Sequence, residues 1–360
     1  MKKLLALILL SMLCSVVFAQ QKADAEVLVK AGIDFHKIGN YEEAIIKYDE
    51  ALKLDSNNLF ALSEKSITLF TLKKYSDCID NCLQAIKYHP KEDDLKDIFV
   101  ICGNAYDESG KTKKAIEIFD EGIAMFPDFF LLYFNKGVSL TSIKKYDEAV
   151  LCFQKSMIYN PSHSSSHNAI ARVLDMKGEI IPALLAYLRF LVIEPQGNRA
   201  VANITGMQRL MKSTTKQNDD NAISLNINTD MMGDTIQTDK KKENDFTSIE
   251  TLLSESNNLL SVKKNRKKSE VERFLLQFDL VCSSLAEQQN SNHGFYWNYY
   301  APYFIEMEKR NFTLTFGYIA LSGTNSKEID KWIKKHKKEI DAFYQWSNEF
   351  KWDSFKSSEH

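Results

Sequence analysis

Few residues of this chain have the types and spacing that catalysis or metal binding requires. His163 and His167 are four residues apart, a spacing that two metal-binding imidazoles use on a helix, but Pro161 and the intervening serines place His163 in a turn, and no third ligand follows from the sequence. The chain contains no GxGxxG, phosphate-binding loop, HExxH, CxxC or GxSxG motif. We therefore expect no catalytic residues, no metal and no cofactor.

The composition indicates a globular protein whose partner is not nucleic acid. The chain has 360 residues, of which 44% are apolar, and its 46 Lys and Arg nearly balance its 48 Asp and Glu. With only 6 Pro and 13 Gly it belongs to neither the fibrous nor the low-complexity classes. This length is enough for two domains.

The first 19 residues have the pattern of a secretory signal peptide. Lys2 and Lys3 precede an apolar run, and Val17-Phe18-Ala19 puts small residues three and one positions before a cut at Gln20. We expect an exported protein, periplasmic or extracellular, without a transmembrane span after signal removal. A retained anchor and lipid attachment at Cys14 stay open as alternatives, although the apolar run is short for a span and Leu13 is large for a lipid-attachment signal.

A period of 34 residues recurs five times along the first half of the chain. In each repeat, positions 4, 8 and 11 fall on one face of a first helix and positions 20, 24 and 27 on one face of a second helix. Small residues at positions 8 and 20 let the two backbones approach. Glycine at position 15 in three repeats marks the turn, and proline at position 32 in four repeats ends the second helix. The repeats are 25–58, 59–92, 96–129, 130–163 and 164–197.

This pattern resembles the tetratricopeptide repeat (TPR) family over residues 25–197. The resemblance implies an all-α fold, a TPR α-solenoid of about five helix-turn-helix repeats, with residues 199–212 as a capping helix and the solenoid spanning 24–212. In this family, positions 2, 5, 9, 12 and 13 of the first helices line a concave groove in which partners bind. The chain is therefore expected to be a non-catalytic scaffold of the cell envelope that holds a protein or peptide.

The resemblance also implies which residues bind the partner. A carboxylate-gripping subfamily has Lys at position 5 and further cations two repeats on, but Val100, Ser165 and Ala169 stand there in this chain, which puts that mode in doubt. Paired amides and apolar anchors remain for an extended peptide, unless the aromatics only pack between repeats and the amides are only solvated. The expected partner-binding residues are Asn104, Asn135, Phe134, Val138, Ile67, Phe70, Phe60, Ile33 and Arg172.

The cysteines beyond Cys14 are expected to be small buried thiols. Four of these five fall within the repeats, most of them at core positions. Cys82 and Cys102 come from neighbouring repeats, so a disulfide between them stays open in an oxidising compartment.

The C-terminal half has a different composition. Residues 213–246 are rich in Asn, Asp, Thr and Lys and are expected to be a flexible linker, within which residues 223–227 alternate like a strand. Helical spacing resumes near Thr247, and residues 247–357 are expected to form a small aromatic-rich helical domain. A faint echo of the helix-turn-helix repeat covers residues 296–322.

Two interpretations of these aromatics stay open. They can form the core of the domain, or an exposed patch for a partner, a glycan or peptidoglycan, with Tyr299, Tyr300, Trp346 and Trp352 as its candidates. The second would make the protein an envelope glycan-binding module. An enzyme whose active site carries no known motif is a third possibility.

Overall fold

The computed structural model describes residues 2–90, 92–212, 215–217, 223–225, 243–261, 268–324 and 326–352, without side chains for 2–19, 215–217, 223–225, 259 and 261. The predicted export signal, 1–19, thus lies outside the residues whose side chains are described. Among the described residues, no helix has the length and apolar content that a membrane span requires. The helices pack into two compact units, a first unit of residues 1–152 and a second unit of residues 153–360.

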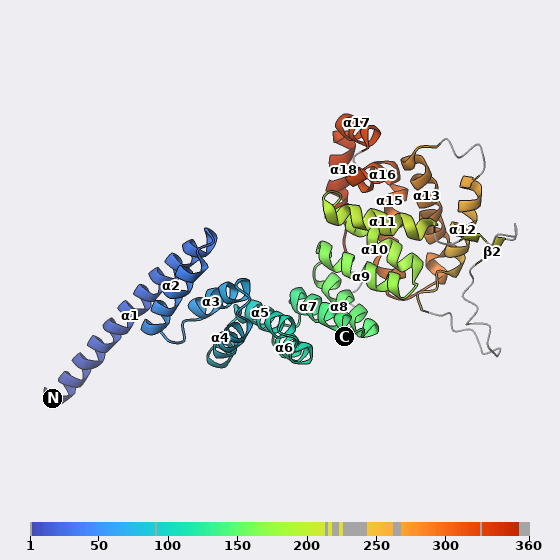
Figure 1. Ribbon diagram of the computed structural model, residues 1–360. Helices are drawn as coiled ribbons and strands as arrows, with labels where there is room; N and C mark the ends of the chain where they lie inside the picture. The colour runs from blue at the N-terminus through green and yellow to red at the C-terminus, as the bar shows by residue number, and fades with distance from the viewer. Residues whose placement is uncertain are drawn as a thin grey trace, which may run out of the picture. The chain divides into compact units, whose positions relative to one another are not determined.

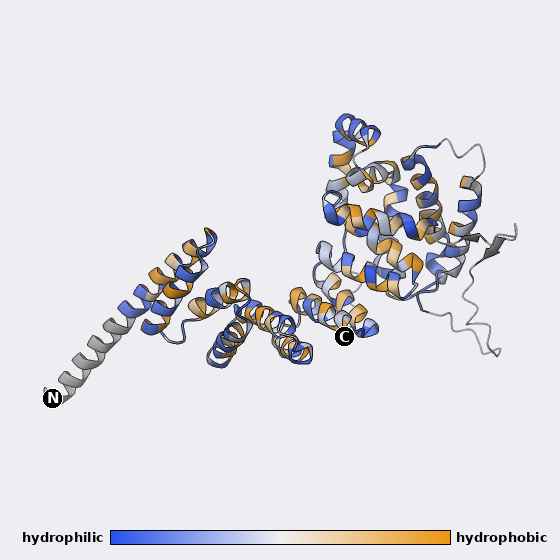
Figure 2. Ribbon diagram, in the orientation of Figure 1, coloured by the Kyte–Doolittle hydropathy of each residue, from blue (hydrophilic) through white to orange (hydrophobic). Residues whose placement is uncertain are grey.

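The predicted repeats are present as consecutive helix pairs (Figure 1). This confirms the all-α solenoid architecture. Helices α2 to α6 carry both hydrophilic and hydrophobic residues along their length, as expected for helices with one buried face (Figure 2). The helices are α1 (Lys2–Lys37), α2 (Tyr41–Leu54), α3 (Leu59–Thr71), α4 (Tyr75–Tyr88), α5 (Leu95–Glu108), α6 (Thr112–Met125), α7 (Phe130–Ser142), α8 (Tyr146–Tyr159), α9 (Ser164–Met176), α10 (Ile180–Ile193) and the predicted capping helix α11 (Asn198–Lys212).

The turn inside every repeat has the same left-handed residue at position 15. Gly39, Gly110 and Gly178 have φ of 79°, 79° and 77°, and Lys73 and Lys144 adopt 57° and 62° at the same position. Each turn closes with the same two backbone hydrogen bonds, such as Gly39 N–H to His36 O and Asn40 N–H to Phe35 O. The geometry of the turn is therefore set by the repeat, even where lysine replaces glycine.

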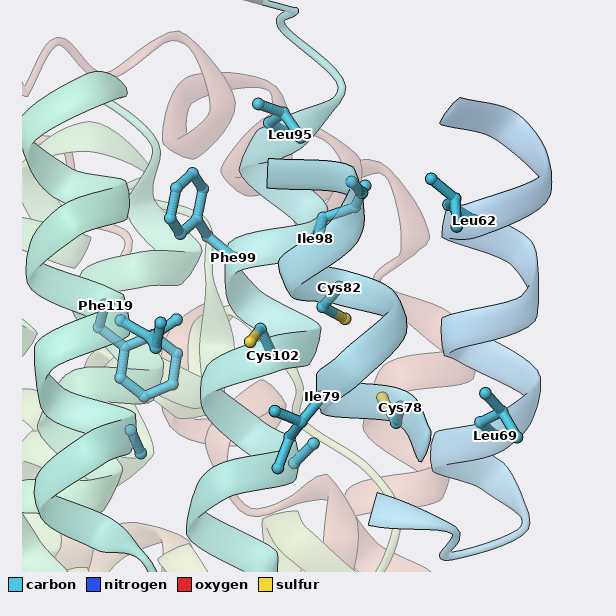
Figure 3. Packing of buried hydrophobic residues seen from close by; sticks show 14 of the residues in the cluster. Leu62, Leu69, Cys78, Ile79, Cys82, Leu95, Ile98, Phe99, Cys102 and Phe119 are labelled. Carbon is cyan, nitrogen blue, oxygen red and sulfur yellow. The ribbon is translucent and has the colours of Figure 1, made fainter. Parts of the chain in front are cut away.

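Small residues bring the two helices of a repeat together. A Cβ added at Gly32 would lie 2.4 Å from the Tyr48 ring, and one at Gly103 would lie 2.3 Å from the Phe119 ring. Only glycine leaves room for these aromatic rings. In the first unit this packing forms an apolar core shared by α3 to α7, in which Cys82 of α4 and Cys102 of α5 lie among leucine, isoleucine and phenylalanine side chains (Figure 3).

The second unit is built around α10. Every residue from Ile181 to Val192 is buried, because α10 packs against α9, α11, α12 and α16. The division between compact units therefore falls inside α8, and not at residues 213–246, since the apolar surface of the last repeat is covered by the C-terminal helices. These are α12 (Thr247–Ser261), α13 (Glu270–Gln288), α14 (Phe295–Tyr299), α15 (Ala301–Lys309), α16 (Thr313–Ala320), α17 (Lys327–Lys335) and α18 (Lys337–Glu349).

Helices α15 and α16 form a further hairpin with the turn of the repeats. Asn311 has φ of 60°, and the N–H groups of Asn311 and Phe312 bond to Glu308 O and Met307 O in the repeat pattern. The packing differs, because Phe304 and Phe316 stand at the positions that hold small residues in the repeats, and their rings are 6.4 Å apart. The faint echo in the sequence thus corresponds to the same turn geometry between helices that carry large side chains at these two positions.

The segment predicted as a linker contains two short strands. β1 (Thr215–Gln217) and β2 (Ile223–Leu225) pair antiparallel, with Thr215 opposite Leu225. The strand-like alternation near residue 223 thus corresponds to a short strand, β2, that pairs with β1. At the other end of the segment, Phe246 stacks on Trp297 at 4.4 Å between ring centroids, and the Trp297 indole donates to Asp245 O. These last residues belong to the core of the second unit.

Candidate functional site

The first helices of successive repeats lie side by side in the first unit. α1 contacts α3, α3 contacts α5, and α5 contacts α7. Side chains connect them: His36 Nδ1 lies 2.8 Å from Thr68 Oγ1, and Ser139 Oγ donates to Asp107 Oδ2 at 2.7 Å. We call this row of helices the first-helix layer; it carries eight of the nine predicted partner-binding residues.

The predicted apolar anchors differ in exposure. Phe60 is 62% exposed and Val138 is 42% exposed. Ile33 and Phe70 are half-buried and pack against the apolar core of the unit. Ile67 and Phe134 are also half-buried, so Phe60 and Val138 present the largest apolar surface to a partner.

The two predicted amides have different environments. Asn135 Nδ2 donates to Leu131 O in its own helix at 2.8 Å. Asn104 is half-buried, and its side chain has no hydrogen-bond partner among the residues that the structure describes. An extended peptide can pair with both the donor and the acceptor of this amide. Asn104 is therefore the better candidate for main-chain recognition.

Two carboxylates of this layer, Glu64 on α3 and Asp97 on α5, have raised pKa values. Burial raises the pKa of Glu64, although the charges of His36 and Lys37 oppose this effect. Burial also raises the pKa of Asp97, opposed by Lys96. Val100, which stands where a carboxylate clamp needs lysine, packs against the apolar core. The layer is thus poorly suited to gripping a free carboxylate.

The ninth predicted residue, Arg172, belongs to the second unit. It lies exposed on α9, and its charge acts on Tyr187 of the neighbouring α10 by lowering the pKa of that phenol, against the larger raising effect of burial. The other eight predicted residues all belong to the first unit.

The C-terminal aromatics are a core and not an exposed platform. Tyr299, Tyr300 and Trp346 are 2%, 0% and 7% exposed and cannot form an exposed patch, whereas the fourth candidate, Trp352, is half-buried. The Tyr299 hydroxyl donates to Met157 O at 2.9 Å, which ties α14 to the end of α8. Trp352 covers Arg189, whose guanidinium carbon is 4.7 Å from the Trp352 ring centroid.

The histidines and cysteines that were considered for metal binding or a disulfide make contacts inside the protein. His163 Nδ1 lies 2.8 Å from Ser166 Oγ, whereas His167 lies between Tyr300 and Pro161. Within the described part of the chain, no cluster of three or more metal-binding side chains is present. The cysteines at 78, 82, 102, 152 and 282 are all free and buried, so Cys82 and Cys102 are unpaired here.

One residue that the sequence analysis did not single out is Arg189. It is 3% exposed, and its guanidinium carbon lies 4.8 Å and 4.7 Å from the ring centroids of Tyr303 and Trp352, which stack on each other. Its Nε has no hydrogen-bond partner among the described residues. A lone charge within the apolar run Ile180–Ile193 is the signal that would have found it.

Comparison with known families supports the repeat assignment. Models of the tetratricopeptide repeat match residues 25–58 and 131–163. A TPR repeat-containing protein of Methanocaldococcus jannaschii is 27% identical over 172 residues, which cover 46% of this chain and 30% of that protein. The Hsp70-Hsp90 organising protein of Plasmodium falciparum is 23% identical over 39% of this chain and 19% of its own length. Our chain therefore spans less than a third of either relative.

Solved structures also show partial similarity to the chain. The structure titled as a functional characterisation of Pseudomonas aeruginosa pilF has a TM-score of 0.47, with 19% identity over 53% of this chain and 84% of that one. YrrB, described as a TPR protein with an unusual peptide-binding site, has a TM-score of 0.40, with 20% identity over 52% of this chain and 95% of its own.

Proposed function

Because the chain belongs to the tetratricopeptide repeat family, we propose that it is a non-catalytic scaffold that binds a peptide or partner protein on its first-helix layer. The names of its relatives support such a role: one organises Hsp70 and Hsp90, and one similar structure is described as having a peptide-binding site. The expected ligand is an extended protein segment held by main-chain hydrogen bonds and apolar anchors.

The observation that carries this proposal is the pairing of an exposed apolar anchor with a free amide. Phe60 on α3 exposes 62% of its surface, and Asn104 on the adjacent α5 has no hydrogen-bond partner among the described residues. Burying an exposed aromatic ring against a partner contributes about 1.5–3 kcal/mol. A free amide adds specificity for a peptide backbone, because it both donates and accepts.

The test is affinity capture with the full chain as bait, followed by a direct binding measurement with the captured partner. Phe60→Ala and Asn104→Ala should each weaken the interaction about tenfold. Leu151→Ala is the matched control, because Leu151 is also 62% exposed but lies on a second helix, α8. Equal loss in the control, or no loss in either variant, would refute the proposal.

We propose further that the protein is exported and works in the cell envelope. This proposal rests on the residue pattern of 1–19, with a basic start, an apolar run and small residues before Gln20. The mass of the protein isolated from its source decides it. A chain that begins at Gln20 supports export with cleavage, and a chain that retains residues 1–19 contradicts it.

A further inference from the structure

The second unit contains a cavity that is separate from the first-helix layer. It has a volume of about 1010 Å³ and is bordered by α14, α15, the turn before α16, and α18. None of its lining residues lies in the repeats, so the inference drawn from it does not depend on the proposed function of the first unit.

Two carboxylates in the cavity wall each accept hydrogen bonds from the described part of the protein through only one of their two oxygens. Trp346 Nε1 donates to Glu306 Oε1 at 3.0 Å, and Arg310 Nε donates to the same oxygen at 2.7 Å. In the same way, Gln345 Nε2 donates to Glu349 Oε1 at 3.2 Å. No described residue donates a hydrogen bond to the Oε2 atom of either carboxylate. The protein thus orients both groups and leaves one acceptor oxygen of each for a ligand.

The remaining polar groups complement these acceptors. Arg310 and Lys351 balance the two carboxylates, so the wall carries no excess charge and does not favour a strongly charged ligand. The Asn298 side chain, which has no partner among the described residues, offers both a donor and an acceptor. Half-buried Phe312 and Phe350 supply apolar surface between these polar groups.

We propose that this cavity binds a neutral saccharide. A carboxylate oxygen only accepts, so the ligand must donate to it, while the amide and ammonium groups require acceptors on the same ligand. Each saccharide hydroxyl does both at one atom, whereas a peptide main chain carries its N–H and C=O groups at separate places. The carbon–hydrogen faces of a sugar ring also suit the phenylalanine surfaces. This site differs from a surface patch of aromatics, because the recognition comes from carboxylates and amides.

The experiment measures binding of defined trisaccharides to the full chain by isothermal titration calorimetry. Chitotriose, maltotriose, cellotriose and mannotriose are the probes, and the tripeptide Ala-Ala-Ala is the competing ligand class. The test variant is Asn298→Ala combined with Gln345→Ala. Asn348→Ala is the control, because Asn348 is exposed on α18 and does not line the cavity.

We expect at least one trisaccharide to bind, and the double variant to weaken that binding about tenfold or more. The control should bind as the unmodified chain does, and the thermal unfolding of all three proteins should be similar, since the altered side chains are exposed. Absence of binding by all four sugars at about 10 mM would overturn the proposal. So would unchanged affinity in the double variant, or equally tight binding of the tripeptide.

Discussion

The Tyr300 hydroxyl lies 2.8 Å from His167 Nδ1 and joins α9 to the C-terminal helices within the second unit. Because the carbonyl of Pro161 can only accept, His167 Nε2 carries the proton and donates to it at 3.0 Å. Nδ1 is then the acceptor for Tyr300. Both residues are fully buried, so a neutral imidazole is built into the contact between the last repeat and the helices that cover it.

This contact predicts a stability loss in acid. Burial lowers the pKa of His167 from 6.5 to about 3, and the nearby charge of Arg189 acts in the same direction. The unfolded chain takes up a proton near pH 6.5 while the folded chain does not. The contribution of His167 is therefore fully present above about pH 6.5 and is lost as the pH falls toward 3, by about 2 kcal/mol at pH 5.

Urea unfolding at pH 7.5 and pH 5 measures this effect. His167→Gln keeps a donor toward Pro161 but cannot titrate, so its stability should change less between the two pH values. His293→Gln removes an exposed histidine and should keep the pH dependence of the original chain. If His167→Gln lost as much stability between pH 7.5 and pH 5 as the original chain, the pH dependence would come from other groups.

The surroundings of Arg189 predict that lysine at this position destabilises the protein more than methionine does. Its buried guanidinium lies beside the stacked rings of Tyr303 and Trp352. Among the described residues it makes only long hydrogen bonds, of 3.4 Å, to Ser347 and to the carbonyl of Pro161. Arg189→Met keeps volume and removes a buried charge, whereas Arg189→Lys buries a strongly hydrated ammonium that cannot stack in the same way. We expect the lysine variant to be less stable than the methionine variant by about 1–3 kcal/mol.

Chemical denaturation of the two Arg189 variants gives this difference directly. Arg172→Lys serves as control on the same unit, because Arg172 is exposed, and it should unfold as the unmodified chain does. A lysine variant as stable as the methionine variant would show that the stacked guanidinium does not determine the packing there.

The repeat turns predict that two lysines limit stability. Lys73 and Lys144 adopt the left-handed conformation that glycine provides in the other three repeats. Lys73→Gly and Lys144→Gly should each stabilise the first unit by up to about 1 kcal/mol. A left-handed backbone costs a residue with a Cβ about 1–2 kcal/mol, and part of this gain is offset because glycine loses more backbone entropy on folding. Gly110→Ala should have the opposite sign.

The unfolding midpoint in urea tests these three variants together. Glu121→Gly, at an exposed position in the middle of α6, is the control and should destabilise by about 1 kcal/mol, since glycine weakens a helix interior. Destabilisation by Lys73→Gly would contradict the interpretation that its conformation is strained.

The two amides of the first-helix layer should not contribute equally to partner binding. Asn104 has a free side chain among the described residues, whereas Asn135 already donates to Leu131 O. Asn104→Ala is therefore expected to cost about 1–1.5 kcal/mol of binding free energy, and Asn135→Ala clearly less. Titration of the captured partner against each variant measures the order, and a reversed order would reject the assignment.

The cysteines should resist modification while the chain is folded. Burial raises the pKa of the Cys82 and Cys282 thiols and raises that of Cys152 to about 11, so little reactive thiolate forms at neutral pH. Mass spectrometry after iodoacetamide treatment should find residues 78, 82, 102, 152 and 282 unmodified in the native protein and alkylated in urea. Rapid native alkylation of Cys82 would contradict its burial.

Local periodicity was sufficient to predict the repeats. The spacing of Gly32, Ala44 and Tyr48 follows from the 3.6-residue helical period and the close contact of two helices, and the structure shows those residues in contact or buried. The start of α13 after Ser269 is also set locally, because its capping box uses only the neighbouring residues Ser269 and Glu272. Such features depend on interactions within a few turns of the chain.

Only the tertiary structure decided what the aromatic half of the chain does. Tyr300 meets His167 across 133 positions, and Glu306 meets Trp346 across 40, and no local period encodes such pairs. The same residue types fit a core or a binding surface equally well in sequence, and burial alone separates the two. The sequence therefore determined the repeats and their turns, whereas packing over long separations determined that the last repeat and the C-terminal helices share one core.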